Sequence, residues 1–164
     1  MHQGAVTHED SFGNLSTVQA GNVQAMSAGS GIRHTERNNG TVPLLLYQIW
    51  LRPRTPGGTP SWATRRFPCE DRAGTLTVLA SGYPGNPDTL PINADARLLG
   101  ATLRAGAAIE HRLPPGWSAY LVSTAGHATV NDVMLAARDG GRRWRHGARD
   151  YALDDTEILL AELG

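Results

Sequence analysis

The chain has 164 residues, enough to bury a hydrophobic core as one large or two small domains. Its 15 basic and 15 acidic residues cancel, so composition gives no sign of a nucleic-acid partner. Every basic residue apart from histidine is arginine, and the absence of lysine excludes Schiff-base chemistry and a P-loop lysine. A single cysteine, Cys69, excludes a disulfide framework and fits a reducing compartment.

Short apolar runs begin close to the amino terminus. Residues 4–8 are predicted to end a strand, which the turn Asp10-Ser-Phe-Gly-Asn14 closes. Two further short strands are predicted over residues 15–18 and 23–26. His8 and Asp10 could act as ligands if the strand ran through both, but a turn residue that caps its own backbone explains Asp10 better.

A bend of small residues, Ala28-Gly-Ser-Gly31, leads into another short strand that holds a candidate metal site. Side chains alternate between the faces of a strand, so Ile32, His34 and Glu36 point the same way. An imidazole beside a carboxylate is a common beginning of a metal site. From this spacing alone, a hydrogen-bonded histidine beside a surface glutamate is the commoner arrangement.

Leu44-Leu-Leu-Tyr-Gln-Ile-Trp-Leu51 is the strongest strand pattern, and its apolar residues on both faces predict a central strand. We expect Trp50 to lie in the core rather than to serve as a substrate platform. Residues 54–71 are rich in proline and glycine, and we interpret them as an irregular linker with Trp62 and Phe67 as anchors.

The remaining sequence repeats short apolar runs between glycine and proline turns, the rhythm of a jelly roll. His111, His127 and His146 are isolated from one another, so we expect this half to bind no metal and to act as a structural partner. The cluster Arg142-Arg-Trp-Arg145 could touch an acidic partner or nucleic acid, although a solvated hairpin is the commoner reading and the neutral charge disfavours nucleic acid.

We expect no signal peptide, because the first residues lack its charged and apolar pattern, and no apolar run is long enough to cross a bilayer. We therefore expect a soluble, cytoplasmic, all-β protein with no membrane partner.

Three separated blocks, Asp10 to Asn14, Gly21 to Glu36 and Leu46 to Pro53, resemble the pirin family. Pirins are bicupins related to bacterial quercetin 2,3-dioxygenases. The resemblance implies two cupin halves of jelly-roll or β-barrel type. We expect a partial first cupin over residues 1–53, a linker over 54–71 and a second cupin over 72–164.

In this family the first cupin holds one metal ion, usually iron, through a His-x-His pair followed by a His-x-Glu pair. By resemblance, His34 and Glu36 are the second pair and bind Fe(II) or another divalent transition metal. Glu36 would also accept a proton from the substrate, a small flavonol-like aromatic molecule. No His-x-His occurs in this sequence, so we expect the first cupin to be incomplete and its metal affinity to be weak, or the metal to be absent.

Two functions follow from the resemblance. The first is a quercetin 2,3-dioxygenase-type oxidoreductase in which half of the metal site is missing. The second is a non-catalytic binding protein, because some pirins act as transcription cofactors or modulators of metabolic enzymes. An incomplete barrel also exposes unpaired strand edges, so we expect either self-association into a dimer or an unstable product.

Overall fold

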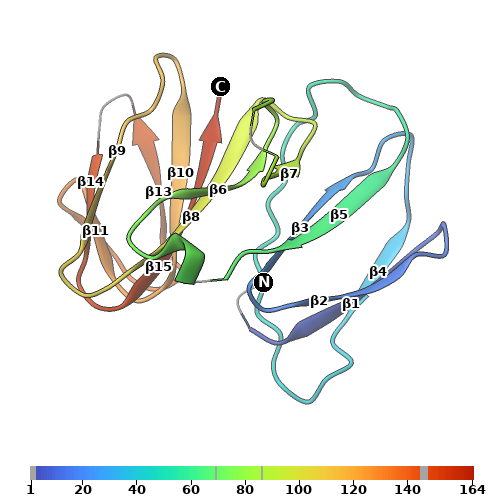
Figure 1. The fold of residues 1–164 in the computed structure, drawn as a ribbon, viewed down its shortest axis with the longest axis horizontal. Coiled ribbons are helices and arrows are strands. Elements are labelled where there is room, and N and C mark those ends of the chain that lie inside the picture. The colour runs from blue at the N-terminus through green and yellow to red at the C-terminus, as the bar shows by residue number, and fades with distance from the viewer. Residues whose placement is uncertain (1–2, 69, 86, 145–147) are drawn as a thin grey trace. The chain divides into compact units, whose positions relative to one another are not determined.

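The computed structural model describes residues 3–68, 70–85, 87–144 and 148–164. Within these ranges the protein is all-β, and its only helical element is the single turn η1 (Glu70–Arg72), so the predicted fold class is confirmed (Figure 1). Contacts between residues divide the chain into two compact units. We call Met1–Pro68 with Leu90–Ala94 the N-terminal unit, and Cys69–Thr89 with Asp95–Gly164 the C-terminal unit.

The N-terminal unit contains a three-stranded antiparallel sheet and a two-stranded ribbon. In the sheet the strand order is β2-β1-β4, and in the ribbon β3 pairs with β5. The short strand β7 (Leu90–Pro91) contacts both strands of the ribbon. The bounds of the other strands are β1 (Ala5–Asp10), β2 (Leu15–Gln19), β3 (Asn22–Ser27), β4 (His34–Arg37) and β5 (Ser61–Arg66).

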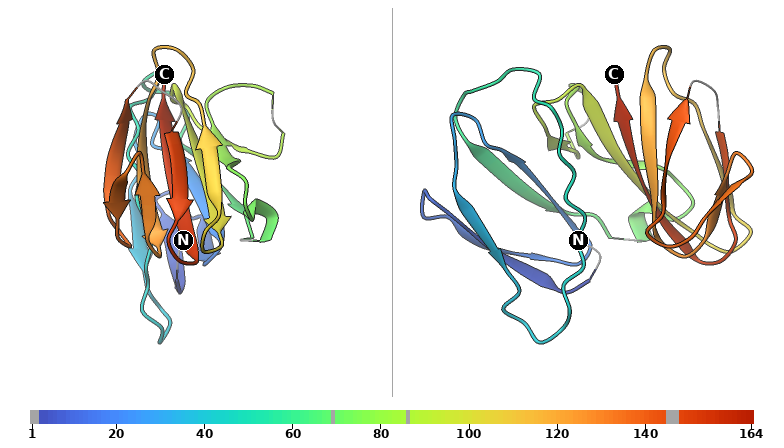
Figure 2. Two further views of the ribbon diagram at one scale, coloured as in Figure 1. Left: turned by 90° about the vertical axis from the view of Figure 1, so that its left-hand side faces the viewer. Right: turned by 180° about the vertical axis from the view of Figure 1, so that it is seen from behind.

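The C-terminal unit contains two antiparallel sheets. Five neighbouring strands of one follow the order β13-β10-β15-β8-β6, and the other has the order β12-β11-β14-β9 (Figures 1 and 2). The strands are β6 (Thr77–Ser81), β8 (Ala96–Leu103), β9 (Ala108–His111), β10 (Ser118–Ala125), β11 (Ala128–Val130), β12 (Val133–Leu135), β13 (Gly140–Trp144), β14 (Ala148–Ala152) and β15 (Thr156–Leu163).

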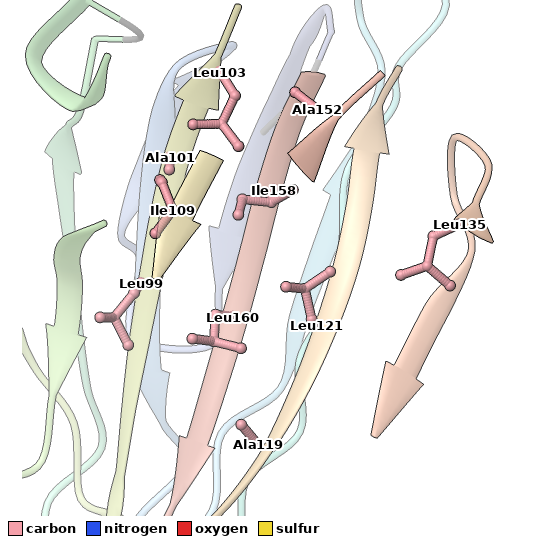
Figure 3. Close-up of a cluster of buried hydrophobic side chains, with 10 residues drawn as sticks. All are labelled: Leu99, Ala101, Leu103, Ile109, Ala119, Leu121, Leu135, Ala152, Ile158 and Leu160. Carbon is pink, nitrogen blue, oxygen red and sulfur yellow. The ribbon is translucent and has the colours of Figure 1, made fainter. Parts of the chain in front are cut away.

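The apolar core of the C-terminal unit lies between its two sheets (Figure 3). Strand β15 shows the alternation on which this core depends. Thr156, Ile158, Leu160 and Glu162 are buried, and the residues between them are more exposed. One sheet contributes Leu99, Ala101, Leu103, Ala119, Leu121, Ile158 and Leu160, and the other contributes Ile109, Leu135 and Ala152. Burial of each large aliphatic side chain contributes about 1.5–3 kcal/mol.

The last inward-facing residue of β15 is a buried acid, Glu162. Glu162 is fully buried, and its two carboxylate oxygens lie 2.5 Å from His111 Nε2 and 2.7 Å from Arg97 Nε. The guanidinium of Arg97 in turn lies over the ring of Trp117, 4.8 Å from its centroid. These partners provide the hydrogen bonding and opposite charge that a buried carboxylate requires.

The prediction of a central strand over residues 44–51 is wrong. Only Leu45 takes part in a β-bridge, with Gln3, and the rest of this segment has no regular structure. Trp50 is 91% exposed, so its predicted place in the core is wrong as well. A strand-forming sequence becomes a strand only when a neighbouring strand accepts its hydrogen bonds.

The irregular connection predicted over residues 54–71 contains a strand. Strand β5 pairs along its whole length with β3, from Ser61 opposite Ser27 to Arg66 opposite Asn22. Trp62, Thr64 and Arg66 alternate with Ala63 and Arg65, a pattern that the surrounding prolines and glycines obscured. The predicted domain limits 1–53, 54–71 and 72–164 stay predictions.

Some expectations concern residues outside the described ranges, namely Cys69, Arg145 and His146. Over the part of the chain that the structure describes, no helix combines the length and apolar character that a membrane span needs.

Candidate metal centre

The pairing of β1 with β4 brings two histidines and a glutamate to one place. In the antiparallel register, His8 lies opposite Glu36 and Asp10 lies opposite His34. Residues directly opposite each other in a sheet project from the same face, as do residues two apart on one strand. The side chains of His8, His34 and Glu36 therefore share the face on which β1 buries Val6 and Asp10.

Asp10 shapes the turn that joins β1 to β2. The Oδ1 atom of Asp10 accepts hydrogen bonds from the backbone N–H of Phe12 at 2.9 Å and of Asn14 at 3.1 Å. The Asn14 side chain donates to Asp10 Oδ2 at 2.8 Å and holds the pKa of this carboxyl below its ordinary value, with smaller contributions from the backbone donors. Asp10 thus caps its own turn, as the sequence favoured.

The bend before β4 brings His34 back to β1. Gly29 has φ of 53°, and a side chain at this position would come within 2.7 Å of Pro60 N, so the close approach of the two chain segments requires glycine. The backbone N–H of Ser11 then donates to Arg33 O at 2.8 Å, and the N–H of Arg33 donates to Ser11 Oγ at 3.2 Å. These bonds align β4 with β1 immediately before His34.

The three side chains are close enough to share one ion. One potential ligand atom from each of His8, His34 and Glu36 lies within 4.8 Å of the other two. His8 Nδ1 is 3.8 Å from Glu36 Oε1, and the rings of His8 and His34 stack with centroids 5.1 Å apart. Nitrogen and oxygen ligands bind a divalent transition metal at about 2.0–2.2 Å, so small side-chain rotations would complete the contacts.

His8 supplies the strongest sign that the residues fit a metal ion. Its side chain is 1% exposed, yet neither Nδ1 nor Nε2 has a hydrogen-bond partner. A buried polar atom without a partner is costly, and such atoms are rare in proteins. A metal ion bound to one of these nitrogens would remove part of that cost. Two histidines and one carboxylate are also the ligand set of many non-haem iron(II) oxygenases.

Two further residues complete the surroundings. The Gln48 side-chain amide donates to Glu36 Oε2 at 2.8 Å, which leaves Oε1 as the oxygen nearest to His8. The Trp62 ring, on β5, lies 5.8 Å from the His8 ring. The site therefore has an aromatic wall on the His8 side, whereas His34 and Glu36 are exposed to solvent.

His34 and Glu36, the residues predicted as metal ligands, lie together as their spacing indicated. Sequence patterns did not favour His8 as a ligand, because its place beside His34 and Glu36 depends on the register between β1 and β4. Trp62 was expected only as an anchor in a linker. The one local signal for His8 was its two-residue spacing from Asp10 before the turn.

The remaining described histidines have other partners. His111 contacts Glu162, and His127 Nδ1 lies 2.7 Å from Asp154 Oδ2. The backbone N–H of His127 donates to Asp154 as well, and this bond is the largest cause of the lowered pKa of Asp154.

Comparison with known proteins gives two family matches along the chain. Residues 1–51 match the model described as Pirin, and residues 78–163 match the Quercetinase C-terminal cupin domain. A pirin-like protein of Caulobacter vibrioides is 45% identical over 168 residues, covering 99% of this chain and 70% of the relative. A quercetin 2,3-dioxygenase of Escherichia coli K12 is 35% identical over 163 residues, covering 98% and 69%.

Solved structures agree with these matches. The crystal structure of YhhW from Escherichia coli superimposes with a TM-score of 0.91 at 33% identity, covering 99% of this chain and 69% of YhhW. A second structure, of the bacterial pirin YhhW in complex with nickel(II), gives 0.90 at 32% identity with the same coverage.

Proposed function

Because the chain belongs to the pirin family of cupin proteins, we propose that it binds one divalent transition-metal ion through His8, His34 and Glu36. We propose Fe(II) as the physiological metal and ring-opening dioxygenation of a flavonol, of the quercetin 2,3-dioxygenase type, as the reaction. The observation that carries this proposal is the convergence of two imidazoles and one carboxylate around a buried, unpartnered His8. The single cysteine supports a cytoplasmic location.

The proposed ligand set differs from the set that the resemblance implies. The resemblance gave this chain only the His-x-Glu pair, and the missing His-x-His pair predicted weak binding. His8, from the strand beside that pair, would raise the protein ligands from two to three. Three protein ligands are enough for a catalytic site and leave open positions for substrate.

When bound, the ion would act as a Lewis acid that acidifies a hydroxyl group of the substrate. Glu36 would accept that proton through Oε1, because Gln48 donates its hydrogen bond to Oε2. The ring of Trp62 would stack against the flat, aromatic substrate. The buried ring of His8, next to Trp62, would exclude water from this side of the site.

The direct test is turnover by the purified protein. Protein loaded anaerobically with Fe(II) and then given quercetin and oxygen should bleach the visible absorbance of quercetin and consume oxygen. His34→Ala should abolish both, because it leaves two ligands. Stoichiometric metal without turnover would refute the substrate and favour a binding role, and a protein that takes up no metal would refute the site.

Gln48 is expected to be a positioning residue. Replacing it with leucine removes the donor that orients Glu36 and should lower metal affinity about tenfold or more, as is usual for partners of metal ligands. The melting temperature of the metal-free protein should change little, since Gln48 is exposed. Competition with a chelator measures the affinity, and Gln19→Leu, at an exposed position of β2, is the control. Equal affinities of the two variants would contradict this role.

A further inference from the structure

His8 has two ring nitrogens, and a single metal ion would bind only one of them. Nδ1 lies 3.8 Å from Glu36 Oε1 and is therefore the nitrogen on the side of the proposed ion. Nε2 is buried and has no hydrogen-bond partner. When a neutral imidazole binds a metal through one nitrogen, the other nitrogen carries a proton and needs an acceptor. In metal proteins this second nitrogen almost always has such a partner, which fixes the orientation of the ring.

The neighbouring strand β2 places a hydroxyl group beside His8. In the pairing of β1 with β2, Ser16 lies directly opposite His8. Opposite residues project from the same face of a sheet with Cβ atoms about 4.5–5.5 Å apart, so the two side chains are within reach of each other. Ser16 Oγ is also buried and also has no hydrogen-bond partner. Two unsatisfied polar groups therefore lie on adjacent strands and on one face of the sheet.

The chemistry of the neighbouring polar groups favours Ser16 as the partner of His8. Among the described residues of the N-terminal unit, Gln24 also has a buried side-chain atom without a hydrogen-bond partner, but that atom is Nε2, which donates and does not accept. Gln24 also lies on β3, which pairs with β5 and not with β1. The carboxylate of Asp10 accepts the hydrogen bonds of its own turn. A serine hydroxyl can accept the proton that a metal-bound imidazole offers.

We propose that Ser16 is a positioning residue of the metal centre, whose hydroxyl oxygen accepts a hydrogen bond from His8 Nε2–H when the ion is bound to Nδ1. Because both nitrogens belong to one rigid ring, a hydrogen bond at Nε2 also fixes the direction in which Nδ1 points. The ion and the hydroxyl group would together satisfy both nitrogens of His8. This inference rests on the proposed function, and it adds a residue that touches neither the ion nor the substrate.

Removal of the hydroxyl group tests this role. Ser16→Ala is expected to lower the affinity for Zn(II), used as a diamagnetic probe and measured by chelator competition, about tenfold or more. Ser16→Thr keeps a hydroxyl group on a residue that suits a strand, so it should restore most of the affinity. Metal-free Ser16→Ala should melt at the wild-type temperature or above it, because Ser16 Oγ has no hydrogen bond to lose.

The matched control is Thr17→Val, which removes a hydroxyl group from the next residue of β2. Thr17 is exposed and projects from the opposite face of the sheet, so this variant should keep the wild-type affinity.

The ring proton of His8 provides a readout that a purely structural serine would not change. In Zn(II)-loaded wild-type protein, nitrogen-15 NMR should show His8 bound through Nδ1, with a hydrogen-bonded proton on Nε2. The resonance of this proton should move upfield in Ser16→Ala and return in Ser16→Thr. The spectrum of His8→Leu assigns the signal, because only the resonances of that ring disappear.

The outcomes separate this inference from the metal site on which it rests. Wild-type protein that takes up no Zn(II) would refute the site itself. Wild-type affinity in Ser16→Ala, together with a loss in His8→Leu, would overturn the role of Ser16 and leave the site intact. The role would equally be overturned if the ion bound Nε2, if Ser16→Thr were as weak as Ser16→Ala, if Thr17→Val were as weak, or if metal-free Ser16→Ala melted well below the wild type.

Discussion

Replacing His8 with leucine is expected to lower the affinity for a divalent metal ion about a hundredfold or more, because two ligands remain where three converge. The same change should leave the metal-free protein at least as stable as the wild type. Leucine is close to histidine in volume and carries no polar atom, whereas both nitrogens of His8 are buried without a hydrogen-bond partner.

These opposite effects separate a ligand from a structural histidine. Chelator competition measures the metal affinity, and thermal melting of chelator-treated protein measures the stability. His127→Leu serves as the control, because His127 lies in the C-terminal unit and contacts Asp154. The assignment fails if His8→Leu keeps wild-type affinity, and a marked loss of metal-free stability would point to a structural role.

Truncating Leu121 to alanine is expected to destabilise the C-terminal unit by about 3 kcal/mol, through lost burial and the cavity left behind. Leu121 is 0% exposed on β10 and belongs to the core between the two sheets (Figure 3). Urea unfolding followed by circular dichroism measures the loss as a lower midpoint with an unchanged slope.

The matched control is Leu153→Ala, where the same atoms are removed from a leucine that is 52% exposed. It should cost less than about 1 kcal/mol, since little apolar surface is buried there. Equal losses in the two variants would mean that the core does not lie between these sheets.

Much of the fold could be predicted from local patterns. The short strands predicted over residues 15–18 and 23–26 lie within β2 and β3, because short runs of strand-forming residues between turns favour this conformation. The turn at Asp10 was predictable for a similar reason, since an aspartate satisfies backbone donors two and four residues ahead. Such signals act within a few residues and need no distant partner.

Local patterns cannot determine whether residues 44–51 and 61–66 form strands. The first has the composition of a strand, but among the described residues it pairs only through the bridge of Leu45 to Gln3. The second is a strand because β3 accepts its hydrogen bonds. Sheet formation is a property of two segments, so composition alone cannot decide which segment pairs.

The candidate metal centre was likewise predictable only in part. The sequence by itself determined that His34 and Glu36 project from one face, because side chains alternate along any strand. Only the tertiary structure decided that His8 joins them, because the register of β1 against β4 places it opposite Glu36. A slip of one residue would turn His8 to the other face, and that register depends on hydrogen bonds between segments far apart in the chain.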